Sequence, residues 1–565
     1  MRSKVFTMLI NMVNASNIMI RRRLIILIFF SFISLISEPI KFSGSLEIYA
    51  EFDTLYGVKQ DRPSRDLRWK FNPNITVFDM PLSFNLFLTN LESNLLQRVN
   101  KFRISLEPNK LSRERVHLPG FLYSISGIQI GASHPDYSYL TLSGIPVNGF
   151  ALELNPGIFY FAFTSGEIQR GGKGSDPTDF AYQRMLYAGK FGFGKKDKNH
   201  LYFTILKSRD NPNSISPYTI PVPRDTSGQD TVEVKTPEEN FLIGIELKIS
   251  LFKDKFSLES ELVGSQFTKD VRTSEVTLKD FPNFVNKILH PRISSSYDYA
   301  YSIKPSLNIL GANIYGGVKM IGPGFKTHGN PYLRNDNLVF ELGGSRKFGF
   351  FSFSTSFLKE ENNLLNFKKS TTSLTSYNIS MSLTPTKLPY FQISYNPYIQ
   401  KNNTLNTENK SSTFSLSSGY SFSYLGVGHS LSINSSYQDY KGENNKNNYK
   451  STGLSLTYST AFKIPLSTSI GAGITKTIRP EETSNLFTLD LSASYTFFKS
   501  WANTLGFNIA SEDKRSKKGL YLTSSFPVRI IGNTSIRLER NIYRDIDKSK
   551  NYNEFLVRFI LSRSW

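Results

Sequence analysis

Apolar and polar residues alternate along most of the chain, in segments of roughly nine to fourteen residues. Between Phe487 and Phe497, the odd positions carry Phe, Leu, Leu, Ala, Tyr and Phe, whereas the even positions carry Thr, Asp, Ser, Ser and Thr. Similar alternation occurs at 67–71, 241–251 and 414–422. Because successive side chains of a β-strand point to opposite faces, the pattern predicts strands with one apolar and one polar face.

Two classes of polar connection, short and long, separate these strands. The two classes alternate along the chain, except in 101–146, where strands are hard to assign. The short class lies at 79–81, 155–157, 195–198, 252–254, 310–311, 384–387 and 463–465. The long class lies at 58–65, 93–100, 167–180, 209–239, 266–297, 323–334, 361–370, 400–410, 438–449 and 541–552. Tight turns at one end and long loops at the other are typical of barrels that cross the bacterial outer membrane. We therefore predict an all-β, antiparallel up-and-down transmembrane barrel of roughly 24 to 26 strands, with both termini in the periplasm and no separate plug domain.

The last strand has the features of an outer-membrane assembly signal. Large apolar residues occupy alternate positions, and the final residue is aromatic: Phe555, Val557, Phe559, Leu561 and Trp565. A terminal aromatic ring is expected in the girdle at the membrane interface, where the outer-membrane assembly machinery would engage the strand. Arg563 interrupts the apolar face, but its long side chain can reach the interface.

A basic cluster, Arg21 to Arg23, precedes an apolar run at 24–37. At about fourteen residues the run is too short to span a membrane comfortably, and it is typical of a signal peptide. We expect a signal peptide at 1–37, with Met19 as a possible start and cleavage between Ser34 and Ser45. The mature barrel would then span 45–565.

The composition agrees with a barrel and excludes several other classes. Hydrophobic residues make up 39% and aromatic residues 14%, with a mean hydropathy of -0.28, because a barrel mixes apolar and polar positions. Removal of 1–37 takes away five basic residues and lowers the net charge from +21 to +16. The basic residues form no nucleic-acid-binding motif, so we expect them to attract lipopolysaccharide or anionic solutes. The absence of cysteine excludes a lipid-anchored N-terminus.

Alternation assigns a set of charged residues to the lumen. These candidate lumen-facing charges are Arg68, Lys70, Arg184, Lys190, Glu246, Lys248, Glu259, Glu261, Asp490 and Arg537. Charges of both signs would create a transverse field that selects solutes. The alternative is that they pair across strands and stiffen the wall. In the last third of the chain, the inward positions are mainly Ser and Thr, which predicts a neutral wall.

The loop at 266–297 contains an apolar stripe at helical spacing, after an Asp cap and an early proline. The stripe consists of Phe281, Phe284, Val285, Ile288 and Leu289. Our main interpretation is a small lid on the barrel mouth, and the alternative is a constriction folded into the lumen. The loop at 209–239 is a second candidate for either position.

No motif indicates catalysis or a cofactor. The six histidines, at 117, 134, 200, 290, 328 and 429, include no pair at metal-ligand spacing. The glycine-rich stretch 189–196 approaches a phosphate-binding loop, but another strand follows where that motif requires a helix. A Gly-x-Ser-x-Gly elbow is absent from the sequence. We expect no enzyme activity, no metal and no cofactor.

The densest local motif is the loop 321–336, with sequence IGPGFKTHGNPYLRND. Its distinctive residues are Gly322, Pro323, Gly324, Gly329, Asn330, Pro331, Tyr332, Arg334 and Asp336. Together with 141–144, 153–163 and 206–214, this loop resembles large porin-like outer-membrane β-barrels of the Bacteroidota type. The resemblance covers residues 45–360, and the remainder is similar only to barrels in general. It implies a β-barrel in the outer membrane of a Gram-negative bacterium, and it brings no substrate, cofactor or catalytic residue.

These observations favour a porin-like channel, or a channel-forming component, that allows passive passage of solutes or export. The alternative is a non-conducting barrel whose external loops bind a partner protein, polysaccharide or lipopolysaccharide. An open lumen favours the channel, whereas a lumen packed with 209–239 and 266–297 favours docking. A periplasmic or surface partner is compatible with both, and nucleic acid with neither.

Overall fold

The computed structural model describes residues 40–57, 63–91, 100–117, 119–173, 180–216, 219–223, 229–233, 235–277, 288–443, 445–545 and 550–565. The predicted signal peptide at 1–37 lies outside the described residues, as do Phe281, Phe284 and Val285. Within the described ranges, no helix has the length and apolar character needed to cross a membrane.

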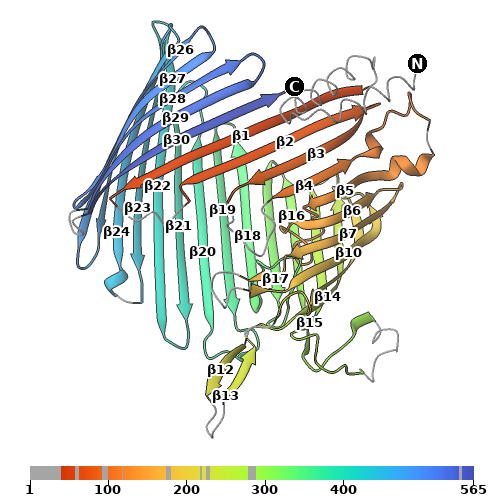
Figure 1. Ribbon diagram of the computed structural model, residues 1–565. Helices are drawn as coiled ribbons and strands as arrows, with labels where there is room; N and C mark the ends of the chain where they lie inside the picture. Colours follow the sequence, from red (N-terminus) through yellow and green to blue (C-terminus); the bar gives the residue numbers. More distant parts are fainter. Residues whose placement is uncertain are drawn as a thin grey trace, which may run out of the picture.

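Twenty-six strands form one closed sheet in which every neighbouring pair is antiparallel (Figure 1). Strands consecutive along the barrel are paired, and β1 pairs with β30 to close it. The predicted antiparallel up-and-down barrel is therefore confirmed, at the upper end of the expected strand number. The barrel strands are β1 (Ile40–Tyr56), β2 (Arg65–Val77), β3 (Met80–Thr89), β4 (Lys101–Leu106), β5 (Ile125–Ser133), β6 (Val147–Leu154), β7 (Phe159–Gln169), β10 (Gln183–Gly194), β11 (His200–Asn211), β14 (Glu239–Leu251), β15 (Phe256–Thr268), β16 (Ser295–Ile309), β17 (Ala312–Ile321), β18 (Asn337–Phe348), β19 (Phe351–Asn362), β20 (Thr372–Leu383), β21 (Tyr390–Asn402), β22 (Thr407–Tyr424), β23 (Val427–Lys441), β24 (Tyr449–Ala461), β25 (Leu466–Ile478), β26 (Thr483–Phe497), β27 (Trp501–Glu512), β28 (Arg515–Val528), β29 (Gly532–Asp545) and β30 (Lys550–Ser564).

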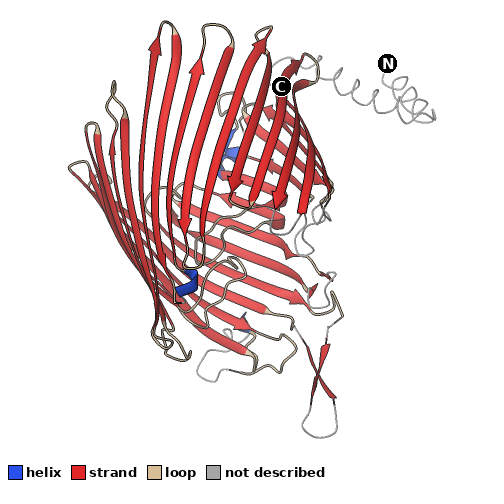
Figure 2. Ribbon diagram, turned by 90° about the vertical axis from the view of Figure 1, so that its left-hand side faces the viewer, coloured by secondary structure: helices blue, strands red, loops and turns tan. Residues whose placement is uncertain are grey.

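Two small hairpins and three short 3-10 helices lie in the connections. They are β8 (Gly172–Lys173) with β9 (Phe180–Ala181), β12 (Thr219–Pro223) with β13 (Gln229–Glu233), η1 (Pro108–Lys110), η2 (Gly120–Ser124) and η3 (Asn445–Asn447). The β12–β13 hairpin projects away from the barrel at the end opposite the C-terminus (Figure 2). Part of the 209–239 loop therefore points outward.

The register keeps the two faces of the barrel distinct around the whole sheet. Directly paired residues share a face, so Leu206 and Leu242 lie on one side, while Ile205 and Ile243 lie on the other. The outer face is apolar and exposed on all sides of the barrel, as Trp69, Ile243 and Leu505 illustrate. A closed barrel with such a surface satisfies its backbone internally and can sit in lipid, so these strands span a membrane.

Most of the tight turns lie at the end of the barrel where β1 begins and β30 ends, although residues 107–124 join β4 to β5 there. The longest connections lie at the other end, where residues 513–514 nevertheless form a tight turn between β27 and β28. The seven predicted short connections all lie at the turn end. The sequence pattern missed the turns at 425–426 and 498–500, among others. Phe498 and Lys499 adopt positive φ angles of 48° and 65° without glycine or proline, so the usual turn residues are missing there.

The last residue closes the seam between the first and last strands. Backbone hydrogen bonds join Trp565 and Gly44 in both directions, at 3.0 and 3.1 Å. Gly44 leaves a gap on the outer face, because a Cβ there would lie 2.7 Å from the Trp565 indole. The indole lies across this gap, and its ring centroid is 6.1 Å from that of Phe71 on β2. Arg563 donates to the carbonyl of Ile530 in the β28–β29 turn.

Candidate translocation lumen

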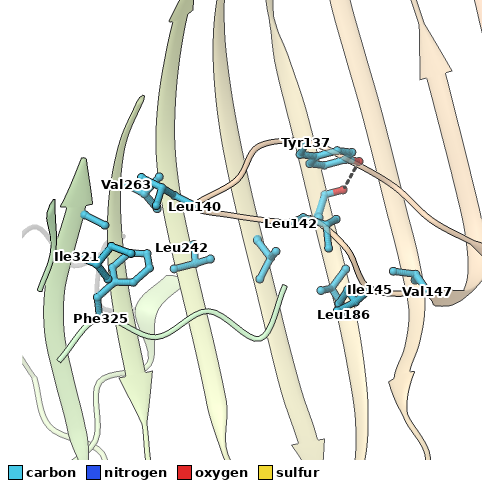
Figure 3. Packing of buried hydrophobic residues seen from close by; sticks show 13 residues of the cluster. Tyr137, Leu140, Leu142, Ile145, Val147, Leu186, Leu242, Val263, Ile321 and Phe325 are labelled. Carbon is cyan, nitrogen blue, oxygen red and sulfur yellow. Dashed lines mark hydrogen bonds between the residues drawn. The ribbon is translucent and has the colours of Figure 1, made fainter. Parts of the chain in front are cut away.

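Two loops from the long-loop end fold into the barrel and pack on its inner wall (Figure 3). One is loop 134–146, between β5 and β6, and the other is loop 322–336, between β17 and β18. Their apolar side chains contact inward residues of β10, β11 and β14 to β17 in a single buried cluster. Its members are Tyr137, Leu140, Leu142, Ile145, Val147, Leu186, Ala188, Leu206, Leu242, Val263, Ala300, Ile321 and Phe325.

The two loops also contact each other through their backbones. The Thr327 hydroxyl donates to the Thr141 carbonyl at 2.7 Å, and the Ser143 amide donates to the Gly329 carbonyl at 3.0 Å. The Asn330 side chain donates to the Tyr139 carbonyl at 2.9 Å. Gly329 permits this approach, because a Cβ there would lie 2.2 Å from the Thr141 carbonyl oxygen. The pair therefore docks as one unit.

Charged residues of the wall hold loop 134–146 in place. The Lys190 ammonium donates to the Tyr137 carbonyl and pairs with Glu246 at 2.6 Å. Glu261 accepts hydrogen bonds from the Ser138 hydroxyl at 2.5 Å and from the Leu140 amide at 3.3 Å. These wall charges anchor a loop. Neither interpretation from the sequence, solute selection or stiffening of the wall, included this role.

A second polar cluster anchors loop 322–336 through His328. The imidazole contacts the Ser208 hydroxyl at 2.7 Å and the Glu238 carboxylate at 3.2 Å. Arg184 binds both Asp210 at 2.6 Å and Glu238 at 2.8 Å. Burial, with a smaller effect from Arg184, lowers the pKa of His328 to about 4. Although burial opposes it, the hydrogen bond from His328 and the charge of Arg184 lower the pKa of Glu238 to about 2.

All ten candidate lumen charges lie on the inner face of the register, and most of them contact a charge of opposite sign. Arg184, Lys190, Glu246 and Glu261 belong to the two anchors described above. The remaining candidates that pair do so as Lys248–Glu259 at 2.7 Å, Arg68–Asp66 at 2.5 Å, Lys70–Glu47 at 2.7 Å and Arg537–Glu539 at 2.7 Å. Asp490 is exposed on the inner face of β26.

The inner wall has a covered sector and an uncovered one. Beneath the two loops, Leu186, Leu206 and Leu242 are 0% exposed. On β20 to β25, every inward position carries an uncharged residue, mostly Ser, Thr, Asn or Gln, and inward Asn434 and Ser436 are exposed. The described loops therefore cover one side of the lumen and leave the other side accessible.

The predicted lid residues that the structure describes lie outside the lumen. The carbonyls of Ile288 and Leu289 accept hydrogen bonds from Lys207 and Gln266, respectively. Lys207 and Gln266 lie on the outward side of β11 and β15, because they pair with Phe241 of the outer face. This end of the 266–297 loop rests on the outside of the rim, which fits neither a lid over the mouth nor a constriction for these two residues.

The family-like loop is one of the two loops that fold inward. Gly322 and Gly324 lie against the Asp298 carboxylate, and the Gly324 amide donates to it at 2.7 Å. Asp336 pairs with Lys368 at 2.5 Å, while Tyr332 and Arg334 are exposed. Pro323 and Pro331 flank the segment that carries Gly329 and Asn330. The glycines therefore serve close packing inside the barrel.

Loop 134–146 was missed from the sequence. Its apolar residues Leu140, Leu142 and Ile145 alternate weakly and sit among Pro, Ser and Gly, so they indicated neither a strand nor a polar loop. Apolar residues in a segment too short to span the membrane were the available signal for an inward-folded loop.

In the described part of the chain, no group of three His, Cys, Asp or Glu side chains is placed to hold a metal ion. Together, the closed sheet, the apolar exterior and the polar interior define the class of membrane-spanning antiparallel β-barrels.

Comparisons with known proteins show no family for this chain. No family model matches the chain, and no curated protein does. Among solved structures, the P pilus usher (PapC) translocation pore has 11% identity over 93% of this chain and 99% of its own, with a TM-score of 0.36. The siderophore receptor PirA from Pseudomonas aeruginosa has 9% identity over 94% and 81%, with a TM-score of 0.39. The outer membrane protein opdK from Pseudomonas aeruginosa has 8% identity over 59% and 95%, with a TM-score of 0.29.

Proposed function

We propose that this protein is an outer-membrane channel of a Gram-negative bacterium, through which polar solutes pass passively. The observation that carries the proposal is the contrast between the two inner walls. Loops 134–146 and 322–336 bury the apolar inner wall of β10 to β17, whereas most inward residues of β20 to β26 stay partly or fully exposed in the part of the chain that the structure describes. A polar, exposed inner surface is the lining of an aqueous passage.

The size of the barrel supports this proposal. Its 26 strands, spaced about 4.8 Å apart and tilted by about 40°, would enclose a circular barrel on the order of 50 Å across. A docked layer of chain occupies about 10 Å of that width, taking the spacing of packed sheets as a guide. One layer on one wall therefore leaves room for a water-filled path beside the opposite wall.

The proposed position in the outer membrane also implies the partners of the protein. The lipid bilayer and lipopolysaccharide contact the outer face, and the assembly machinery recognises β30, whose Trp565 completes the seam. The turn end of the barrel, where β1 begins, is the periplasmic end. Removal of the signal peptide at 1–37 would precede assembly. A periplasmic or surface partner would bind at one of the two open ends.

Because the chain has no cysteine, a thiol reagent can react only with the cysteine that a single-cysteine variant introduces. Such variants therefore test the channel directly. Ser436 and Ser435 are adjacent on β23, but Ser436 pairs with Ser415 on the inner face, whereas Ser435 pairs with Leu416 on the outer face. Purified Ser436→Cys protein in a planar bilayer should show ionic current that a charged, water-soluble thiol reagent reduces. The Ser435→Cys control should conduct and be insensitive, because lipid covers its thiol.

Two results would contradict the channel. Absence of conductance steps in folded, heat-modifiable protein would favour the non-conducting docking barrel. Equal sensitivity of Ser435→Cys and Ser436→Cys would show that the assigned faces do not separate lumen from lipid.

A further inference from the structure

The uncharged wall extends from one end of the barrel to the other. On β20 to β25, the inward positions contain no Asp, Glu, Lys, Arg or His, although 20% of the whole chain is charged. Charged residues do occur on these strands, but on the outer face near the rim, as with Lys401, Lys410 and Lys450. The neutrality is therefore a property of the inner face.

Hydroxyl groups on this wall are hydrogen-bonded mainly to each other. Cross-strand pairs on the inner face include Ser394–Ser415 at 2.6 Å, Ser459–Ser469 at 2.9 Å and Ser451–Thr477 at 3.2 Å. Either oxygen of each pair can act as the donor. Hydroxyls can rotate and can both donate and accept, so each pair can exchange its internal bond for bonds to a solute hydroxyl.

Tyrosines stand on this wall near its outer end. Tyr440 of β23 is paired in register with Tyr449 of β24, and their rings stack with centroids 5.3 Å apart and an interplanar angle of 23°. Tyr398 of β21 lies in the same lateral row, separated from Tyr440 by Ser411. All three side chains are partly exposed. They form a row of aromatic rings beside the external mouth, in which the Tyr440 and Tyr449 rings face each other.

A tyrosine and a groove mark the other end of the same wall. Tyr390 of β21 lies over Gly419 of β22, where a Cβ would be 2.5 Å from the ring. The adjoining groove has a volume of about 870 Å³. It is lined by Tyr390, Ser421, Ser430 and Ser432, by the outward Tyr420, Phe422 and Leu431, and by the 384–388 turn, which includes Lys387. A groove of this size and polarity suits a small polar ligand.

From this arrangement we propose that the wall of β20 to β25 is a track for uncharged polyhydroxylated solutes, specifically linear oligosaccharides. The proposal rests on the channel function and names its substrate class. A sugar ring offers an apolar C–H face for stacking on tyrosine and an edge of hydroxyls for the Ser, Thr, Asn and Gln side chains. An ion finds no countercharge on this wall, and an apolar solute would leave the wall's hydroxyls and amides unpaired. Oligosaccharides satisfy both kinds of group at once.

To test the proposal, maltohexaose is added at the long-loop end of the barrel, and its block of the single-channel current is measured. Neutral polyethylene glycol of equal hydrodynamic radius and oligogalacturonate are the comparison probes. Maltohexaose should block at a lower concentration than either. In the Tyr440→Ala/Tyr449→Ala variant, its half-blocking concentration should rise about tenfold, as expected for loss of one aromatic contact.

Three controls separate binding from folding. The Tyr440→Phe/Tyr449→Phe variant keeps the rings and should retain the sugar block. Tyr437→Ala removes an outward tyrosine three residues away on β23 and should leave the block unchanged. Heat modifiability of each variant reports the folded barrel.

The possible outcomes distinguish this proposal from the channel itself. Ionic current with equal block by maltohexaose and polyethylene glycol, or with no effect of the alanine pair, would overturn the oligosaccharide track and leave the channel intact. Absence of ionic current in every variant would overturn the channel, and the track with it.

Discussion

Gly329→Ala should release the docked loops and enlarge the open lumen. The added Cβ would lie 2.2 Å from the Thr141 carbonyl oxygen, 3.0 Å from the Leu142 Cα and 3.0 Å from the Leu206 Cδ1. Two of these three atoms belong to loop 134–146, and the third belongs to β11 beneath it. Because two are backbone atoms of a packed loop, they cannot move aside as a flexible side chain would. The loops must separate at this point.

The size of the effect follows from the contacts that separation breaks. The hydrogen bonds made by Thr327, Ser143 and Asn330 are the three inter-loop bonds closest to Gly329. At a net value of about 1 kcal/mol each, their loss weakens docking by about 3 kcal/mol. This change lowers the ratio of docked to undocked protein roughly a hundredfold. Loss of packing around Leu142, which is fully buried, adds to the effect.

Single-channel recording and limited proteolysis measure the result. Gly329→Ala should show higher or noisier conductance than the unaltered protein, and cleavage within 134–146 or 322–336 should become faster. Gly316→Ala is the matched control, because the nearest atom to its Cβ would be 3.7 Å away, an ordinary contact. Unchanged conductance and unchanged protease resistance in Gly329→Ala would refute the docking argument.

Three further changes test other parts of the structure. Trp565→Ser should lower the amount of heat-modifiable barrel in the outer membrane, because the indole fills the gap over Gly44. Trp565→Phe should restore that amount. Wild-type levels of the Trp565→Ser variant would contradict this role. Loop 322–336 should dock fully above pH 6.5 and progressively loosen towards pH 4, because the docked His328 has a pKa of about 4 and a free imidazole one of 6.5. Hydrogen exchange of this loop at neutral pH and near pH 5 measures the change, and His328→Phe should lose the pH dependence. Lys190→Met should destabilise the folded barrel by about 3 kcal/mol in urea unfolding, since it removes the ammonium that pairs with Glu246 beneath the loop and leaves the Glu246 hydrogen bond to His200. Adding Glu246→Gln should recover part of that loss, and no recovery would show that the pair is not coupled.

The local sequence pattern was sufficient to predict the barrel, but it was insufficient to predict the loops that fold into it. The period of two in segments such as 487–497 defines a strand and its two faces without long-range information, and turn and loop lengths define the order of strands. The strand between Lys101 and Leu106 is short, and the apolar residues after Ser133 belong to a loop, so the pattern failed between 101 and 146. There the local signal for a strand and the signal for an inward-packed loop overlap.

Inward charges illustrate the same limit. Alternation assigned Lys190 and Glu261 to the inner face, where the register places them, but their contacts with Tyr137 and Ser138 join residues far apart in the chain. Whether a wall charge faces water or anchors a loop depends on which loop covers it.

By itself, the sequence determined an antiparallel membrane-spanning barrel, the number of its strands to within two, and the inward Ser and Thr positions of β20 to β25. These features depend on the alternation of neighbouring residues, which the backbone geometry of a strand converts directly into faces. Only the tertiary structure decided which loops enter the lumen and which wall stays exposed. Docking of 134–146 onto 322–336 depends on the fit at Gly329 and on anchors from β10, β11 and β15, and such contacts exist only once the barrel has closed.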